Sequence, residues 1–206
     1  MSARKPVIYV VDDDVSVRRA LTLLLKTHGY RAVTFSGAAD FLAFDHPRGV
    51  ACLLLDVRLP GIDGPALQEL LAGRVPAIPI VFITGHGSIP IGVKAMKQGA
   101  VDFLLKPFIA KDLLDAIGRA LLKSAAWNSE FAEAARILRR IGTLSPRELE
   151  VFHFVIRGLL NKQIATKRGT SLQTIKVHRS RVMQKMRART VTELINLARK
   201  AGVVSA

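Results

Sequence analysis

The sequence has a single cysteine, and it lacks any apolar run as long as the roughly 18 residues that a membrane-spanning helix needs. One thiol cannot form an intrachain disulfide, and the position of Cys52 in an apolar strand pattern predicts a buried, inert side chain. The first residues lead into a strand pattern without the apolar core of a signal peptide. From these absences we expect a cytoplasmic protein that makes no membrane contact.

Acidic residues are scarce in the C-terminal part of the chain. Residues 125–206 carry 16 Lys and Arg against 5 Asp and Glu, whereas residues 1–124 carry 15 against 11. The net charge of +15 is therefore divided into +4 and +11. Such an excess on one segment indicates a polyanionic partner, most often nucleic acid, although an anionic membrane surface would attract it too.

Apolar runs of strand length alternate with helical patterns over the first 122 residues. The expected strands are 7–11, 31–35, 51–55, 80–84 and 102–105, and the expected helices are 15–28, 38–44, 64–71, 89–97 and 110–122. Five successive βα units predict an α/β fold, a doubly wound parallel sheet with helices on both faces. The pattern stays helical to Ile141, which predicts a linker helix. Alternatively, the apolar residues of this stretch pack together on one neighbour; they are Phe131, Ile137, Leu138 and Ile141.

No strand pattern follows Gly142, and capping signals predict a small all-α domain of four helices. Ser145 with Glu148 forms a capping box, and later helices are expected from Asn161, Ser171 and Thr190. The helix that ends near Arg168, the turn at Gly169 and the helix that reaches Met186 together predict a helix-turn-helix. We expect domain boundaries at 1–123, 124–142 for the linker, and 143–206.

Polar residues stand at the ends of four expected strands: Asp12 and Asp13, Asp56, Thr84, and Lys106. Because open α/β sheets bind ligands beyond the carboxyl ends of their strands, we expect these side chains to converge. An aspartate can act as a nucleophile toward phosphorus when the charge is neutralised. Mg²⁺ takes oxygen ligands, which Asp13 and Asp56 can supply with Asp12 acting through water. Lys106 supplies a cation and Thr84 a hydroxyl donor, so the pattern predicts a phosphoryl-accepting site.

The order and spacing of these residues resemble the receiver domain of two-component response regulators, over about residues 5–123. The motifs are VDDD at 11–14, LDVRLPGIDG at 55–64, ITGHG at 83–87 and DFLLKPF at 102–108. The resemblance implies a flavodoxin-like (βα)₅ fold with Asp56 as the phosphoryl acceptor. It also implies Mg²⁺ ligands from Asp13, Asp56 and the backbone carbonyl of Arg58, with Asp12 in the acidic pocket.

The same resemblance implies a switch formed by Thr84 and Phe103. In that family the hydroxyl turns toward the phosphoryl group and the aromatic ring follows inward, which remodels the face of the fourth helix, fifth strand and fifth helix. Phe103 stands where many members have tyrosine, and the alternative is that it is an ordinary core residue. We do not expect His86 to be a general base, because loop histidines are common and the five histidines have no metal-ligand spacing.

The expected helix from Ser171 to Met186 has an apolar stripe and a polar, basic face. Lys, Gln and Ser side chains can bond base edges, Val177 can meet a thymine methyl group, and basic side chains can reach phosphates. The candidate DNA-binding residues are Gln173, Thr174, Lys176, Val177, Arg179, Ser180, Arg181 and Lys185. The alternative is that this face is simply solvated.

The segments LSPRE at 144–148, NKQIA at 161–165 and TIKVHR at 174–179 resemble the LuxR-type DNA-binding domain over about residues 140–203. The whole chain resembles the NarL/FixJ response regulators, and among them the FixJ-like branch. This implies base-facing positions at Lys176, Val177 and Ser180, and a dimer contact on DNA from residues 192–201. Arg168 departs from the family, which usually has a core leucine there; it either weakens the small core or adds a DNA backbone contact.

The resemblance implies a transcription regulator that a cognate sensor histidine kinase phosphorylates on Asp56, after which it dimerises and binds promoter DNA. RNA polymerase is a candidate further partner, and we expect no enzymatic turnover beyond loss of the chain's own phosphoryl group. One alternative is a phosphorylation-independent nucleic-acid-binding regulator with the receiver as a docking scaffold; the complete Asp13, Asp56, Thr84 and Lys106 set argues against it. Another is an aspartate-nucleophile phosphohydrolase, which generally needs a second carboxylate where Arg58 stands.

Overall fold

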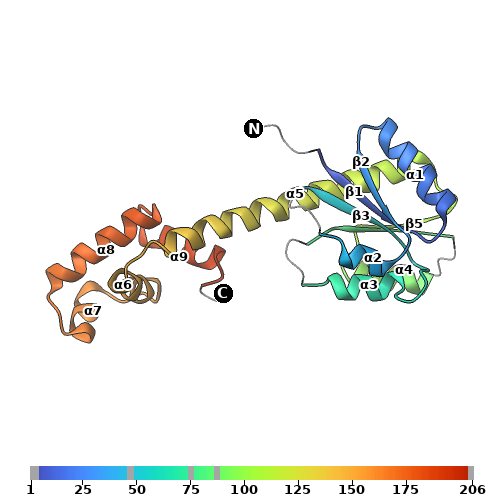
Figure 1. Cartoon of the computed structure of the whole chain (residues 1–206). Helices are drawn as coiled ribbons and strands as arrows, with labels where there is room; N and C mark the ends of the chain where they lie inside the picture. Colours follow the sequence, from blue (N-terminus) through green and yellow to red (C-terminus); the bar gives the residue numbers. More distant parts are fainter. Residues whose placement is uncertain (1–4, 46–48, 74–76, 86–88, 204–206) are drawn as a thin grey trace. The chain divides into compact units, whose positions relative to one another are not determined.

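The computed structural model describes residues 5–45, 49–73, 77–85 and 89–203, and the chain divides into two compact units, Met1–Ser129 and Glu130–Ala206. The first unit is built from strands and helices and the second from helices alone (Figure 1). Each unit buries apolar residues of its own. In the part of the chain that the structure describes, no helix is long and apolar enough to cross a bilayer.

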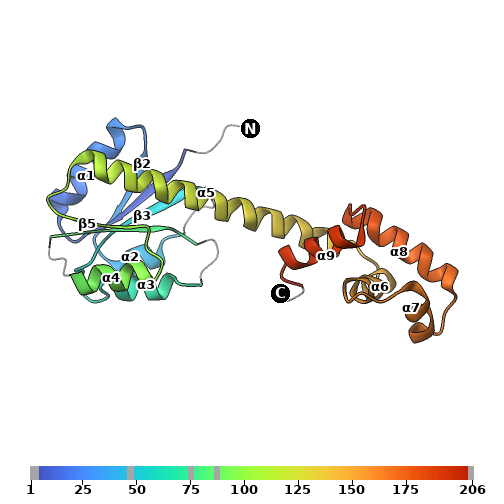
Figure 2. The same cartoon turned by 180° about the vertical axis from the view of Figure 1, so that it is seen from behind.

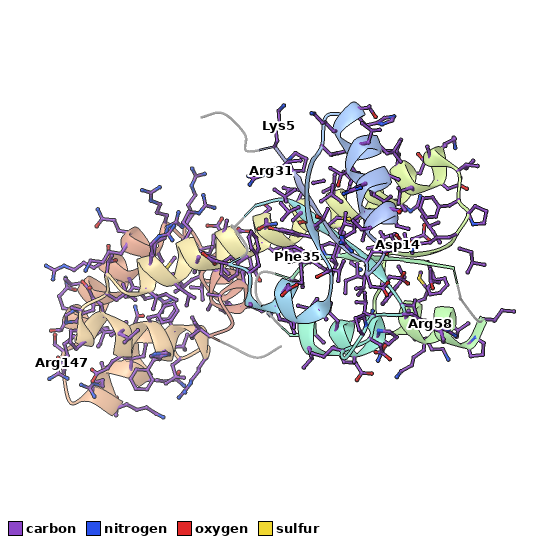
Figure 3. All side chains as sticks on the ribbon, turned by 45° about the vertical axis from the view of Figure 1, so that its right-hand side comes forward. Lys5, Asp14, Arg31, Phe35, Arg58 and Arg147 are labelled. Carbon is purple, nitrogen blue, oxygen red and sulfur yellow. The ribbon has the colours of Figure 1, made fainter. Side chains whose placement is uncertain are left out.

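The first unit is built on a five-stranded parallel sheet in the order β2-β1-β3-β4-β5. The strands are β1 (Val7–Val11), β2 (Arg31–Phe35), β3 (Ala51–Asp56), β4 (Ile80–Thr84) and β5 (Asp102–Leu105). Strand order reverses between β1 and β3, which is where open α/β sheets form their ligand crevice. Asp14 and Arg58, which follow β1 and β3, lie toward the same end of this sheet (Figure 3).

Helices cover both faces of the sheet, which confirms the predicted doubly wound α/β fold. The helices are α1 (Val15–Thr27), α2 (Ala38–Ala43), α3 (Gly64–Leu71), α4 (Ile89–Lys97) and α5 (Ala110–Ile141). Helices α1 and α5 lie on one face of the sheet and α2 and α3 on the other (Figure 2). Leu25 and Leu113 are buried in the core of the first face, and Phe41 and Leu67 in the core of the second. Cys52 lies in the first of these cores, where burial raises the pKa of its thiol, so the prediction of an inert side chain fits.

The expected receiver helix and linker helix are one continuous helix, α5. Its polar residues bind the segment that enters β3: the Ala51 amide donates to Ser124 Oγ at 3.0 Å, and Asn128 Nδ2 donates to the Gly49 carbonyl at 3.0 Å. Further along, Ile137 is buried in the core of the second unit, whereas Leu138 is exposed. Ile141 packs against the same core and Phe131 is exposed, so two of the four apolar residues of this stretch share one neighbour.

The second unit consists of short helices around a small apolar core. After the end of α5 these are α6 (Pro146–Ile156), α7 (Asn161–Arg168), α8 (Leu172–Met186) and α9 (Val191–Lys200). Ser145 and Glu148 form the expected reciprocal capping box, and Ser171 caps α8 by accepting from the Thr174 amide at 3.0 Å. Gly169 ends α7 with a left-handed φ of 59°. The all-α prediction for this part is confirmed.

Candidate functional site

Three carboxylates gather at the carboxyl ends of β1 and β3. These strands are neighbours, with Val11 opposite Leu55, so Asp12, Asp13 and Asp56 leave the sheet at one place. One oxygen of each carboxylate lies within 4.8 Å of the other two. Asp12 is fully buried and Asp56 is 8% exposed. Because carboxylates this close repel one another, the cluster favours a bound cation.

Lys106 supplies one such cation from the end of β5. Its Nζ donates to Asp12 Oδ2 at 2.7 Å and to Asp56 Oδ2 at 3.0 Å. The backbone holds this position, since the Lys106 amide donates to the Thr84 carbonyl at 2.8 Å. Burial lowers the pKa of Lys106, but its hydrogen bonds and charge attraction to Asp12 and Asp56 outweigh that effect, and the pKa lies above its ordinary value. The ammonium is therefore a fixed positive charge between the two carboxylates.

The carboxylates differ in how they are held. Asp12 Oδ1 accepts from the Asp14 amide at 3.0 Å, and Asp56 Oδ1 accepts from the Arg58 amide at 3.2 Å. Burial raises the pKa of Asp12, and the bond and charge of Lys106 only partly oppose this. The exposed Asp13 has no side-chain hydrogen bond or ion pair among the described residues. Three carboxylates form a hard oxygen donor set of the kind that Mg²⁺ binds, so the cluster fits a magnesium site.

Sequence reasoning missed Arg18, which lies beside this cluster on α1. Its Nη1 donates to the backbone carbonyls of Asp12 at 2.7 Å and Asp13 at 2.9 Å. A signal was available, because Asp14 caps α1 and a residue four positions into a helix faces back over its first turn.

Thr84 and Phe103 lie on the neighbouring strands β4 and β5. Thr84 is buried at the end of β4, with Leu105 opposite it on β5. The half-buried ring of Phe103 lies 6.1 Å from that of Phe82, measured between ring centroids. On its other side it faces α4, where a Cβ built on Gly92 would lie 3.5 Å from the ring. His86 lies outside the described residues.

The exposed face of α8 carries most of the candidate DNA-binding residues. Ile175, Val182 and Met186 are buried on the opposite side. The exposed members are Gln173, Thr174, Lys176, Val177, Ser180, Arg181 and Lys185. The helical spacing therefore brings these side chains together on one accessible surface.

Two of the basic candidate DNA-binding residues bind partners within their own unit. Arg179 is half-buried and its Nη1 donates to Asn161 Oδ1 at 2.7 Å. Lys185 donates to Glu148 Oε2 at 2.6 Å and to the Thr143 carbonyl at 3.0 Å. The bond from Lys185, followed by the bond from the Ser145 amide, lowers the pKa of Glu148 to about 2. Both basic side chains are therefore engaged in holding α8 to α7 and α6.

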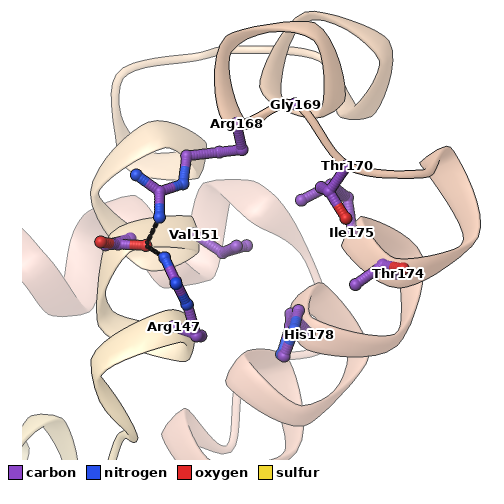
Figure 4. A pocket seen from close by; sticks show the side chains of 9 residues that line it. Arg147, Val151, Arg168, Gly169, Thr170, Thr174, Ile175 and His178 are labelled. Carbon is purple, nitrogen blue, oxygen red and sulfur yellow. Dashed lines mark hydrogen bonds and ion pairs between the residues drawn. The ribbon is translucent and has the colours of Figure 1, made fainter.

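Arg168 also binds an acidic partner within the unit. Its guanidinium lies 2.6 Å from Glu150 Oε2, and Arg147 reaches the same oxygen at 3.3 Å (Figure 4). These residues line a cavity of about 310 Å³ whose walls include Val151 and Ile175. Arg168 thus lies at a cavity with mostly polar walls, and its charge is paired with Glu150.

Comparison with known proteins agrees with this architecture. The model of the response regulator receiver domain matches residues 8–118, and that of bacterial regulatory proteins of the luxR family matches residues 142–198. Nodulation protein W of Bradyrhizobium diazoefficiens is 44% identical over 202 residues, which are 98% of this chain and 89% of the relative. Transcriptional regulatory protein FixJ of the same species is 40% identical over 198 residues, 96% of this chain and 97% of the relative.

A solved structure of the response regulator StyR is similar over nearly the whole length. It is 44% identical with a TM-score of 0.78, and the match covers 95% of this chain and 99% of that chain. The sequence matches, the parallel sheet with its acidic cluster and the helix-turn-helix unit all lead to one assignment. The chain belongs to the NarL/FixJ family of response regulators, which regulate transcription through a receiver domain and a LuxR-type DNA-binding domain.

Proposed function

We propose that Asp56 accepts a phosphoryl group from a cognate sensor histidine kinase, and that this modification controls DNA binding. The observation that carries the proposal is the position of Lys106 Nζ, 2.7 Å from Asp12 and 3.0 Å from Asp56, beside a third carboxylate. An Asp56 oxygen forms a bond to phosphorus while the bond between phosphorus and the histidine nitrogen of the phosphorylated kinase breaks. Lys106 neutralises the incoming phosphoryl oxygens.

We assign Mg²⁺ as the cofactor of this site. Its ligands would be Asp13, Asp56 and the backbone carbonyl of Arg58, with Asp12 acting through water. When bound, the ion supplies charge neutralisation for the transferred group. Arg58 also bears on the hydrolase alternative, because it places a cation where an aspartate-dependent hydrolase needs its second carboxylate, so we expect no substrate turnover.

Thr84 and Phe103 are our candidates for the switch. Thr84 lies at the strand end next to that of Asp56, within the edge that receives the phosphoryl group. The added group carries about −1.5 to −2 charges, which attracts a hydroxyl donor. Phe103 packs between β4 and α4, so a change at Thr84 can pass to α4 through this ring.

We propose that phosphorylation promotes a homodimer that binds promoter DNA. The base-facing residues would be Lys176, Val177 and Ser180, with further contacts from the remaining candidates: Gln173, Thr174, Arg179, Arg181 and Lys185. Residues 192–201 would make the dimer contact on DNA. We assign residues 1–123 to the receiver domain, 124–142 to the linker and 143–206 to the DNA-binding domain. A DNA-reading regulator of this kind acts in the cytoplasm, with RNA polymerase as a candidate further partner.

Sedimentation of the full chain in Mg²⁺, before and after adding beryllofluoride as a stand-in for the phosphoryl group, tests the proposal. We expect the wild type to dimerise and Asp56→Asn to remain monomeric, with tighter promoter binding only for the wild type. Equal DNA affinity of the two proteins under all conditions would instead favour the alternative that DNA binding does not depend on phosphorylation.

A further inference from the structure

We propose that Arg18 is a positioning residue for the metal site, because it holds the backbone that carries Asp13. This inference rests on the proposed function of the acidic cluster. One guanidinium nitrogen, Nη1, donates to two successive carbonyls, those of Asp12 at 2.7 Å and Asp13 at 2.9 Å. A charged donor shared by two neighbouring peptide groups fixes the turn between β1 and α1 more firmly than one neutral bond would.

Arg18 matters for Asp13 because the three carboxylates differ in the hydrogen bonds that hold their side chains. Asp12 is held by Lys106 and the Asp14 amide, and Asp56 by Lys106 and the Arg58 amide. Asp13 has no such side-chain partner within the described ranges, so its carboxylate is directed by its backbone. Arg18 is the side chain that binds the Asp13 carbonyl.

The backbone of Arg18 is itself held in place by hydrogen bonds of helix α1. The Arg18 amide donates to the Asp14 carbonyl at 3.0 Å in the first turn of α1, and the Asp14 side chain caps that turn. Thr22 Oγ1 donates to the Arg18 carbonyl at 2.7 Å. Arg18 therefore joins a capped helix to the strand end from which the metal ligand projects, as outer residues of metal sites commonly do.

Arg19 offers a matched control on the same helix. It carries the same charge one residue away, its side chain is exposed, and within the described residues it makes no hydrogen bond or ion pair. Removing either arginine changes the net charge equally, so the long-range electrostatic effect on a bound cation is similar. Only removal of Arg18 releases the two carbonyls.

The experiment is a titration of the metal-free full chain with Mg²⁺, with the dissociation constant read from amide NMR shifts of residues 12–14. We expect Arg18→Met to weaken binding about tenfold, as loss of outer-shell support typically does. Arg18→Lys keeps the charge and can reach one carbonyl, so we expect an intermediate constant. Arg19→Met should bind Mg²⁺ as the wild type does or slightly more tightly.

Asp13→Asn and the melting temperature of each metal-free variant separate the outcomes. Asp13→Asn should weaken binding; if it does not, the proposed metal site is wrong, whatever Arg18 does. If Asp13→Asn weakens binding while Arg18→Met and Arg19→Met have equal constants, Arg18 has no positioning role. A lower melting temperature of Arg18→Met with an unchanged constant would make it a structural residue only and would also overturn the proposal.

Discussion

Gly64 lies so close to the carbonyl oxygen of Asp56 that a Cβ on this glycine would stand 2.3 Å from it. The Gly64 amide donates to the Val57 carbonyl at 2.9 Å, so the first turn of α3 closes directly over the end of the acceptor strand. The same Cβ would stand 3.0 Å from the Val57 Cα and from the Phe82 ring. The position of the proposed acceptor is thus set partly by a residue that has no side chain.

Gly64→Ala should therefore destabilise the first unit and displace Asp56. We expect a loss of about 2 kcal/mol in the free energy of unfolding, because the backbone of β3 has to shift to admit the methyl group. Beryllofluoride-dependent dimerisation should need more reagent. Urea unfolding of the full chain, followed by NMR signals of the sheet, measures the first effect.

Gly118→Ala is the control for a glycine that no neighbour constrains. It lies inside α5, and a Cβ there would meet nothing within 4 Å. We expect this change to stabilise the protein by about 0.5–1 kcal/mol, since alanine loses less backbone freedom in a helix. A similar loss from both substitutions would show that the contact with Asp56 does not matter.

The element pattern could be predicted closely because each buried strand is an apolar run that ends at polar residues. Asp56 illustrates the remaining error: the structure extends β3 by this one residue, since its backbone still pairs opposite Ile83 of β4. The helical pattern to Ile141 predicted how far α5 extends, but not how it is held. The hydrogen bonds that join Ser124 to Ala51 and Asn128 to Gly49 span 73 or more positions, and no local pattern encodes them.

Side-chain partners were the least predictable part of the candidate sites. The spacing of α8 shows which residues face outward, but not that Lys185 turns back to Glu148 or that Arg179 binds Asn161. Long basic side chains have many rotamers, and the choice depends on acceptors that the fold brings from other helices. For Arg18 the helix direction indicates that the side chain turns back over the first turn of α1, but not which backbone carbonyls accept its hydrogen bonds.

The stability of the second unit should fall in acid because of Glu148. Its folded-state pKa of about 2 lies below the ordinary value of 4.5, so the folded state binds a proton more weakly than the unfolded state. The stabilisation is therefore fully present above pH 4.5 and is lost as the pH falls through about 2. Urea unfolding of the full chain at pH 6 and pH 3, followed by the NMR signals of residues in α6 to α9, should show this loss of stability.

Glu148→Gln isolates the charge, because glutamine can still serve the capping box with Ser145. We expect it to cost about 1.5–3 kcal/mol at neutral pH, the usual contribution of a hydrogen bond to a charged group. The difference from the wild type should shrink at pH 3. An equal difference in unfolding free energy between the two proteins at neutral pH and at pH 3 would mean that protonation of Glu148 does not remove the stabilisation that its charge provides.

Arg168→Leu should stabilise the second unit. The Arg168 side chain is 30% exposed and that of Glu150 is 40% exposed, and an ion pair at the surface contributes about 0–1 kcal/mol. A leucine at this place can bury its own side chain against Val151 and Ile175, which line the cavity of about 310 Å³. We expect a gain of about 1 kcal/mol from the added apolar burial, with DNA affinity unchanged. Weaker DNA binding without a gain in stability would assign Arg168 to the DNA backbone instead.

DNA binding should distinguish the free basic residues of α8 from the engaged ones. Lys176, Arg181 and Lys185 are all exposed, but in the described part of the unit Lys185 alone of the three binds partners, Glu148 and the Thr143 carbonyl. We expect Lys176→Ala to cost about 1–3 kcal/mol and to relax specificity at one base position. Arg181→Ala should weaken binding to all sequences and reduce the salt dependence by about one counterion.

Lys185→Ala should behave differently from both substitutions. Because its ammonium is engaged within the unit, its removal leaves the charge of Glu148 without its cation and should lower the melting temperature. At temperatures where the variant is folded, the slope of log affinity against log salt should equal that of the wild type. A reduced slope with an unchanged melting temperature would show that Lys185 leaves Glu148 and binds a phosphate when DNA arrives.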